Sequence, residues 1–196
     1  DLVLVDSRGN GFQVGVGGLH NLAPRGRWEA SGTHTLINVD VKSYYPSLIA
    51  RNDFSPLNCP SYSKTIAGEF ARRLAVKVEA KDPSTTKERL ADLKAEDAGL
   101  KLIMNSSFGK LKEKFSTIRD AKAHFSVTIS GQLLLLKLID MIQASVVDCE
   151  LINANTDGVC YYIARTELDK VRAVMKDWEK IAGVELEEEI YKRWVQ

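Results

Sequence analysis

The chain has 196 residues, and 44% of them are hydrophobic, which is enough for a packed core of one or two domains. Its 27 basic and 26 acidic side chains nearly cancel, so a strongly cationic surface offers no argument for nucleic-acid binding. The three cysteines lack metal-ligand spacing and indicate buried free thiols in a reducing compartment. No apolar run approaches the roughly 20 residues of a membrane span, so we expect a cytoplasmic protein without a membrane partner.

Both ends of the sequence look structured. The first residues, DLVLVDS, have the composition of a strand and lack an initiator Met, and the last, EIYKRWVQ, stop inside another extended run. We therefore expect a fragment of a longer protein.

The first forty residues are rich in glycine and in β-forming side chains. Gly9-Asn10-Gly11 predicts a turn between the extended runs LVLVDS and FQVGVGG. A further strand, TLINVDV, ends near Asp40, and SLIARND after Pro46 predicts a short helix.

The middle of the chain predicts helices. Residues 66–81 carry Phe70, Leu74 and Val78 at four-residue spacing, which indicates a helix with an apolar stripe. Pro83 ends that helix, and Thr86 can cap a second one over residues 87–105. Two helices joined by a short polar turn predict an antiparallel hairpin. The apolar stretch 131–146 predicts a mostly buried helix.

The last third begins with a predicted β-hairpin, CELINANTDGVCYYIA, whose tip carries Asp157. Thr166 with Asp169 predicts the start of a helix that ends before Gly183, and residues 184–195 predict one strand. Together the elements predict an α+β fold, an antiparallel sheet with helices on one face and an inserted helical hairpin. We expect the hairpin at residues 57–109, between sheet segments at 1–56 and 110–196.

Two acids occupy comparable positions, because Asp40 ends one apolar strand and Asp157 lies at a hairpin tip. Adjacent strand ends can bring two carboxylates within several ångströms, and hard oxygen ligands of this kind suit Mg²⁺. Such a pair is typical of two-metal phosphoryl transfer. The alternative is that each Asp is an ordinary turn residue.

Three motifs occur in an order that resembles family B DNA polymerases, particularly the phage type. Asp40-Val41-Lys42-Ser43-Tyr44-Tyr45-Pro46-Ser47 is similar to the first family motif. Lys101-Leu102-Ile103-Met104-Asn105-Ser106-Ser107-Phe108-Gly109 resembles the second, with Phe108 in place of tyrosine. Asn155-Thr156-Asp157-Gly158 resembles the third, with Asn155 in place of its first acid. The resemblance implies a polymerase palm with an inserted fingers hairpin, and it spans nearly the whole chain.

The resemblance also implies roles at the site. Asp40, Asp157 and the backbone carbonyl of Val41 would bind two Mg²⁺ ions, for which Mn²⁺ can substitute. The helix start at Ser43, Tyr44 and Tyr45 would bind the triphosphate, since helix N-termini suit phosphate oxygens. Tyr45 matches the family's steric gate against a ribose 2′-OH. The alternative is that the two tyrosines are core aromatics.

On the fingers, the resemblance makes Lys101 a triphosphate ligand that can protonate the leaving pyrophosphate. Asn105 lies one turn further along the same face. Arg73 and Lys77 resemble a phosphate-binding pair on the facing helix. The alternative is that these cations are solvated surface charges.

Further residues resemble DNA contacts of the family, with weaker motifs. These are the glycine loop, the last two residues of the second motif, a primer-contact motif in which Gln replaces Arg, and a C-terminal pair near the primer end: Gly17, Gly18, Phe108, Gly109, Thr128, Gly131, Gln132, Lys192 and Trp194. For Gly17 and Gly18, the alternative is that they only form a tight turn.

The sequence therefore predicts the palm and fingers of a DNA-directed DNA polymerase that acts on primer–template DNA and deoxynucleotides, in the host cytoplasm if phage-encoded. Exonuclease and thumb domains would belong to the parent chain. Tyr45 and the Asn-Thr-Asp tip argue against RNA synthesis and reverse transcription. The alternative from another class is a non-catalytic, polymerase-like binding or scaffold module.

Overall fold

The computed structural model describes residues 2–22 and 25–196, and the chain separates into two compact units. The sheet unit consists of Asp1–Tyr44 and Thr128–Gln196, and the hairpin unit of Tyr45–Val127. The predicted boundaries at residues 56 and 109 stay predictions.

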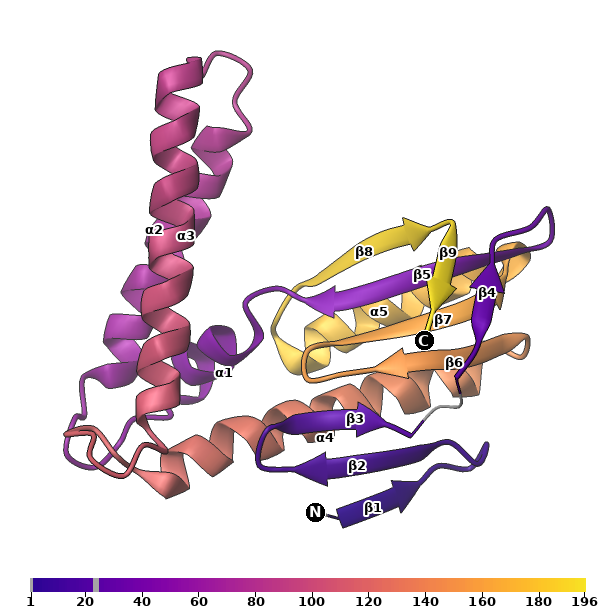
Figure 1. The fold of residues 1–196 in the computed structure, drawn as a ribbon, viewed down its shortest axis with the longest axis horizontal. Helices are drawn as coiled ribbons and strands as arrows, with labels where there is room; N and C mark the ends of the chain where they lie inside the picture. Colours follow the sequence, from indigo (N-terminus) through magenta and orange to yellow (C-terminus); the bar gives the residue numbers. More distant parts are fainter. Residues whose placement is uncertain (1, 23–24) are drawn as a thin grey trace. The chain divides into compact units, whose positions relative to one another are not determined.

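A four-stranded antiparallel sheet forms the centre of the sheet unit (Figure 1). Its order is β6 (Cys149–Ala154), β7 (Gly158–Ala164), β5 (His34–Val41) and β8 (Leu186–Tyr191). The two middle strands, β5 and β7, are buried along most of their length, as their apolar sequences require. The predicted β-hairpin at 149–164 is confirmed.

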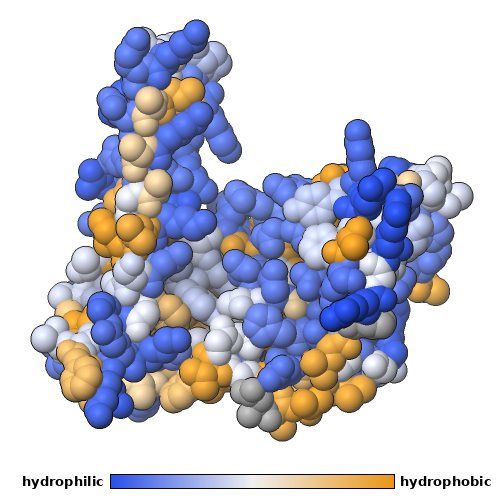
Figure 2. Space-filling model, in the orientation of Figure 1, coloured by the Kyte–Doolittle hydropathy of each residue, from blue (hydrophilic) through white to orange (hydrophobic). Residues whose placement is uncertain are grey.

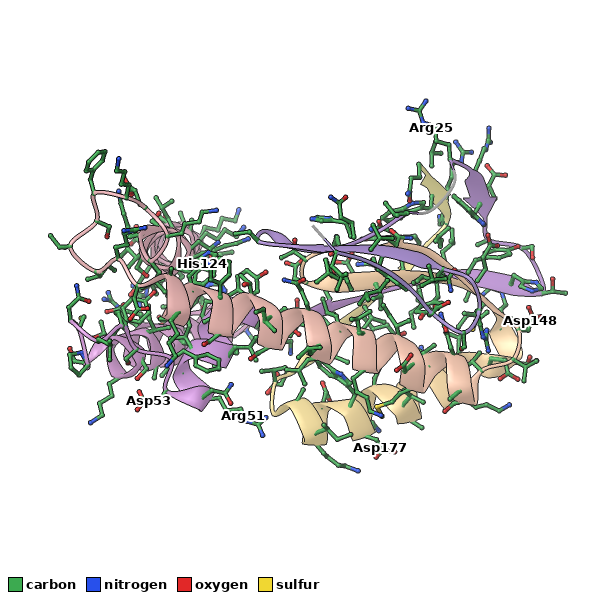
Figure 3. The ribbon with its side chains drawn as sticks, turned by 90° about the horizontal axis from the view of Figure 1, so that it is seen from below. Arg25, Arg51, Asp53, His124, Asp148 and Asp177 are labelled. Atoms are coloured by element: carbon green, nitrogen blue, oxygen red, sulfur yellow. The ribbon has the colours of Figure 1, made fainter. Side chains whose placement is uncertain are left out.

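Two helices lie on one face of this sheet (Figure 3). They are α4 (Ala121–Ser145), of which the part from Thr128 belongs to the sheet unit, and α5 (Leu168–Ala182). The indole of Trp178 on α5 is fully buried, and its Nε1–H donates to the Leu134 carbonyl on α4 at 2.8 Å. Helices therefore cover one sheet face, as the sequence predicted.

Strand β6 contains a bulge that changes its pairing with β7. Leu151 lies opposite Tyr161, but Asn153 lies opposite Cys160, so two steps on β6 correspond to one step on β7. The extra residue is Ile152, whose side chain is fully buried against Leu36 and Cys160.

A second, three-stranded sheet consists of β1 (Leu2–Val5), β2 (Gly11–Gly15) and β3 (Gly18–Asn21). The predicted turn at Gly9 is confirmed, and its φ of +84° is in the region that favours glycine. The predicted run FQVGVGG is not one strand, because it contains most of β2, the turn at Val16 and Gly17, and the first residue of β3. The exposed apolar side chains of edge strand β1 gather on the surface in Figure 2.

The last predicted strand also divides, because Lys192 interrupts it. Strand β8 ends at Tyr191, and β9 (Arg193–Val195) pairs instead with β4 (Arg27–Glu29). The end of α5 matches its prediction, since Gly183 is the left-handed cap with φ +62°. Its start does not, because a 3₁₀ turn at Arg165–Glu167 precedes the helix and no side chain caps it.

The hairpin unit contains α1 (Tyr44–Asn52), α2 (Tyr62–Ala80) and α3 (Lys87–Lys110). The predicted helical hairpin is confirmed, and the Thr86 hydroxyl accepts from the Arg89 amide at 3.2 Å at the start of α3. Helix α3 runs five residues beyond the predicted end at Asn105, and α4 begins ten residues before its predicted start.

The predicted apolar stripe of α2 is wrong. Leu74 and Val78 are 43% and 71% exposed, whereas the buried hydrophobic residues of this helix are Tyr62, Ile66 and Val76. Val76 packs against Leu93 and Leu100 of α3. A strict four-residue spacing drifts around a helix of 3.6 residues per turn and leaves the contact line within two turns.

Helix α4 is long and apolar enough to span a membrane by length and composition, with a mean hydropathy of 1.5 in its most apolar window. A core helix passes the same test, and 44% of that window is buried inside the protein. The three cysteines are free thiols as predicted, but Cys160 is buried whereas Cys59 and Cys149 are only half-buried.

Candidate active site

The two predicted acids converge at one end of the four-stranded sheet. Asp40 on β5 lies directly opposite Gly158, the first residue of β7, and Asp157 precedes that glycine. The Val41 amide donates to the Asp157 carbonyl at 2.8 Å, so the backbone joins the strand end to the hairpin tip. The hydrogen-bond register of the sheet therefore brings these residues of two separate motifs together.

The hairpin tip has a local reason for its shape. The side-chain oxygen of Asn155 accepts from the amides of Asp157 at 3.2 Å and Gly158 at 2.9 Å, which is the bonding of an Asx turn. A Cβ atom at position 158 would lie 2.0 Å from Oδ1 of Asp40. Position 158, beside Asp40, therefore requires glycine. The side-chain oxygen of Asn155 accepts the hydrogen bonds of the turn, as an aspartate oxygen at this position could also do.

The electrostatics of the site disfavour a bare negative charge on Asp40. Burial raises the pKa of Asp40, and the neighbouring charge of Asp157 raises it further. A 2.5 Å hydrogen bond from Asn38 opposes these effects without cancelling them. A cation beside the two carboxylates would relieve both the burial and the repulsion.

Two further acids near Asp40 were missed in the sequence. Strand β8 pairs Glu187 with Asp40 and Glu189 with Asn38, so all four side chains share one face of the sheet. Both glutamates also raise the pKa of Asp40. The alternation of the run Glu185 to Glu189 on a predicted strand was the available signal, since residues two apart face the same side.

The acid pair could supply some of the ligands of a divalent cation, while a bound substrate supplies others. Among residues 2–22 and 25–196, no group of three or more His, Cys, Asp or Glu side chains is arranged to hold a metal ion. Mg²⁺ is usually bound by one or two carboxylates together with water and substrate phosphates. Asp40 and Asp157 provide two such carboxylates, and the Val41 carbonyl is a candidate third protein ligand.

The start of α1 follows the first acid directly. Ser43 has φ +45°, a left-handed conformation that is uncommon for a residue other than glycine, and α1 begins at Tyr44. The Tyr44 ring is buried, and its hydroxyl donates to the Gly131 carbonyl at 2.6 Å. The Tyr44 side chain is therefore a core aromatic, as the alternative interpretation holds. Only the backbone amide of Tyr44 stays a candidate for binding phosphate.

In the hairpin unit, the first and second motifs contact each other. The rings of Tyr45 and Phe108 lie 4.8 Å apart at an interplanar angle of 46°. Phe108 also stacks on His124 at 4.8 Å and 12°. The candidate sugar gate therefore contacts Phe108 of the second motif.

The predicted fingers cations differ in their surroundings. Lys101 and Asn105 are exposed one turn apart on α3, and Lys77 on α2 is half-buried. The predicted phosphate-binding role of Arg73 is corrected, because the side chain is buried between the helices and its Nε lies 2.8 Å from Oδ1 of Asp97. An arginine held by a carboxylate inside the hairpin is not presented to a triphosphate.

The predicted primer-contact motif on α4 is also corrected. Thr128 and Gln132 are only 1% and 3% exposed, and Gly131 is buried with its carbonyl bound to the Tyr44 hydroxyl. The amide nitrogen of Gln132 donates to the Gly15 carbonyl at 2.9 Å. This face of α4 packs into the sheet unit, so the motif holds the protein together and does not face DNA.

The remaining DNA-contact candidates lie at several places. Gly17 is exposed with open space around it, whereas Gly18 is buried against Thr156 of the hairpin tip. Gly109 lines an open hollow of about 600 Å³ whose other walls are Ser106, Lys110, Lys112 and Glu113.

The two C-terminal candidates, Lys192 and Trp194, differ in their surroundings. Lys192 is exposed, as a DNA contact requires. The Trp194 ring stacks on Tyr191 at 5.9 Å and packs against the core cluster of Leu36, Ile152 and Cys160. The predicted stacking of Trp194 at the primer end is therefore corrected, because Tyr191 and the core cluster already contact its ring.

No protein-family model matches the chain, and no curated protein sequence matches it. Among solved structures, the chain is similar to the family B DNA polymerase from the hyperthermophilic archaeon Pyrobaculum calidifontis, with a TM-score of 0.63 and 18% sequence identity. The match covers 87% of this chain and 25% of the archaeal chain, so this chain spans about a quarter of the neighbour's length. The likeness shows a mixed fold of antiparallel sheets and five helices similar to a family B DNA polymerase domain, and the predicted fold class is confirmed.

Proposed function

We propose that this chain is the palm and fingers part of a family B DNA-directed DNA polymerase. One observation carries the proposal: Asp40 and Asp157, from two motifs 117 positions apart in the sequence, meet at the end of one sheet. The likeness of fold to an archaeal polymerase supports it independently. The phage-type subclass and the exonuclease and thumb domains of a parent chain stay predictions from the motifs.

In the proposed reaction, the primer 3′-OH attacks the α-phosphate of a deoxynucleotide and the bond to pyrophosphate breaks. Asp40 and Asp157 would hold the cations, with the Val41 carbonyl as a further ligand. Two Mg²⁺ ions, or Mn²⁺ in their place, would when bound activate the attacking oxygen and stabilise the leaving one. The amides of Ser43, Tyr44 and Tyr45 at the start of α1 would bind triphosphate oxygens.

Lys101 would supply positive charge to the triphosphate and a proton to the leaving pyrophosphate. Its exposure on α3 supports this role, and Lys77 and Asn105 are its candidate helpers. Arg73 is not included, because it is paired with Asp97 inside the hairpin.

Tyr45 is the candidate residue for sugar selection. Its ring contacts Phe108, which supports one edge and limits how far the ring can move away from a bulkier sugar. We expect Tyr45→Ala to reduce the preference for deoxynucleotides over ribonucleotides by about 10²-fold, because a site that excludes a group by contact loses that exclusion when the contact is removed. Single-nucleotide primer extension with each sugar measures the preference, and equal discrimination by wild type and variant would contradict the assignment.

Thermal stabilisation tests the whole proposal without requiring turnover. A deoxynucleoside triphosphate with Mg²⁺ or Mn²⁺ should raise the melting temperature of the protein, because a ligand that binds only the folded state stabilises it. Asp40→Ala should abolish the effect. If wild type and variant respond equally, or neither responds, the acid pair does not bind a metal–nucleotide complex and the scaffold alternative is favoured.

A further inference from the structure

The hairpin of β2 and β3 contacts the end of the sheet that carries Asp157. Its turn is formed by Val16 and Gly17, because Gly15 and Gly18 are paired across the two strands. The predicted role of Gly17 and Gly18 in contacting DNA accounts for an exposed turn, but it does not account for the burial of Gly18.

Contacts with other elements hold this hairpin in place. At one strand end, Gln132 of α4 donates to the Gly15 carbonyl at 2.9 Å. At the far end of β3, the Asn21 side chain accepts from the Ala154 amide at 2.9 Å and donates to the Ile152 carbonyl at 3.3 Å. Strand β3 therefore lies beside β6, the strand that leads into the acid tip (Figure 1).

Gly18 of this hairpin also packs closely against Thr156. A Cβ atom added at Gly18 would lie 2.6 Å from Oγ1, 2.9 Å from Cγ2 and 3.0 Å from Cβ of Thr156. These separations are well inside van der Waals distance, so only glycine allows the approach. The φ of +145° at Gly18 is also a conformation that favours glycine.

Thr156 is the residue immediately before Asp157, and the tip is held on its other sides by hydrogen bonds. Val41 bonds the Asp157 carbonyl, and Asn155 bonds the Asp157 and Gly158 amides. The contact of Thr156 with Gly18 adds packing from β3 to these hydrogen bonds. An anchored hairpin pressed against a turn restricts that turn, since packed elements resist displacement.

We propose that Gly18 is a positioning residue for Asp157, which it holds in place through Thr156. The glycine hairpin then sets the orientation of the carboxylate as well as lying beside it. The relevance to nucleotide addition depends on the proposed function, whereas the clamp itself does not.

Amide hydrogen exchange of the uncomplexed protein, without metal, nucleotide or DNA, tests the clamp directly. In Gly18→Ala, the added methyl group must displace Thr156, and exchange at the Val41, Asp157 and Gly158 amides should rise about tenfold or more as the tip opens locally. Gly17→Ala is the matched control, because nothing lies within 4 Å of a Cβ at position 17. It should leave these rates unchanged.

Backbone strain at position 18 is a competing explanation, and a double variant separates it from the contact. Thr156→Ala removes the two side-chain atoms nearest to the added methyl but does not change the φ of residue 18. We expect Gly18→Ala/Thr156→Ala to return to the exchange rates of Thr156→Ala alone, which should exceed wild type only about threefold. If the double variant exchanges as fast as Gly18→Ala, strain explains the effect and the clamp is rejected.

Two other results bear on the proposal. Unchanged exchange in Gly18→Ala would overturn it at once. If Gly18→Ala does not fold, Thr156→Ala still tests the contact, because wild-type exchange rates in that variant would show that Thr156 restricts nothing.

Kinetics of primer extension connect the clamp to the proposed function. Gly18→Ala should lower kcat about tenfold at unchanged KM for the deoxynucleotide, because a misplaced carboxylate affects the transition state more than binding. Gly32→Ala is the kinetic control, because nothing lies within 4 Å of a Cβ at position 32 and the residue has no proposed role, and it should not lower kcat. If wild type itself shows no extension, the polymerase proposal fails, and the exchange results still decide the clamp.

Discussion

The sheet unit and the hairpin unit hold their charged residues by different means. In the sheet unit, Asp40 and Asp157 are placed by backbone pairing and by the Val41–Asp157 hydrogen bond. In the hairpin unit, arginines of α2 and α3 are placed by carboxylates of the partner helix, as in the pairs Arg72–Glu96, Arg73–Asp97 and Arg89–Glu79. Like charges are therefore brought together at the strand end, whereas opposite charges are paired between the two helices. Opposite-charge pairs such as Arg172–Glu188 also occur in the sheet unit, but away from the acid pair.

This difference shows how to separate a candidate site from structural charge. Two acids forced together at a strand end raise the pKa of Asp40 and leave a requirement for a cation. An arginine bonded to an aspartate has that requirement met within the protein. In the hairpin unit, the exposed Lys101 is thus a better ligand candidate than the buried Arg73.

The largest expected effect is at the acid pair. Asp40→Asn and Asp157→Asn should each reduce nucleotide addition by about 10³-fold or more, since several kcal/mol of transition-state stabilisation would be lost. Asp40→Asn should not lower the melting temperature, because burial and Asp157 already disfavour its charge. Asp148→Asn is the control, an exposed acid at the opposite end of β6 that should leave primer extension unchanged. Full activity of Asp157→Asn would remove the basis of the proposed function.

The next effect concerns stability in the hairpin unit. Arg73→Met leaves Asp97 without its partner and should lower the free energy of unfolding by about 3 kcal/mol, as measured in urea. Arg73→Met with Asp97→Leu should recover most of that loss, because an apolar pair replaces the ion pair. If Arg73→Met retains wild-type stability but loses triphosphate binding, Arg73 is a substrate ligand after all.

Lys101 should show the opposite pattern. Lys101→Ala is a substitution at an exposed site and should change the free energy of unfolding by less than about 0.5 kcal/mol. It should reduce the rate of nucleotide addition by about 10²-fold, measured by rapid quench, because one charged group at the phosphates is lost. Lys94→Ala, at another exposed lysine two turns earlier on α3, is the control. Equal effects of the two variants would contradict the role of Lys101.

The smallest effect is a pH dependence in the hairpin unit. Burial lowers the pKa of His124, and Lys112 lowers it further, so folding favours the neutral ring. The unfolded chain therefore binds more protons below about pH 6.5, and stability should fall as the pH decreases through that range. The urea midpoint of wild type should drop between pH 8 and pH 5 by more than that of His124→Phe. Parallel pH profiles would contradict this interpretation.

Most strands and the acid tip could be predicted from sequence because they depend on local patterns. Apolar runs, the turn at Gly9 and the hairpin at Asp157 each have a short-range signal, and the Thr86 cap has one as well. The three motifs added the expectation that distant acids meet. Glu187 and Glu189 were missed because their proximity to Asp40 depends on which strand pairs with β5, and no local pattern specifies that.

Burial was harder to predict than secondary structure. The side chains of Gln132 and Trp194 suit a nucleic-acid contact by type, but each is covered by a segment far away in the sequence. The stripe at Leu74 and Val78 failed for a related reason, because a helix alone does not indicate which side meets its partner. Tertiary packing decides which face of an element is buried, and amino-acid composition alone does not distinguish the faces.

The bulge at Ile152 has a consequence for how this protein can vary. Leu151 and Asn153 lie opposite the consecutive residues Tyr161 and Cys160, so they face opposite sides of the sheet although they are two positions apart. Losing one residue at the bulge would therefore restore regular pairing and leave Asn153 and Ala154 opposite their present partners, at the cost of a fully buried side chain. An added residue has no such place to go and would turn the segment that leads to Asp157 over, so we expect this part of β6 to tolerate a deletion better than an insertion.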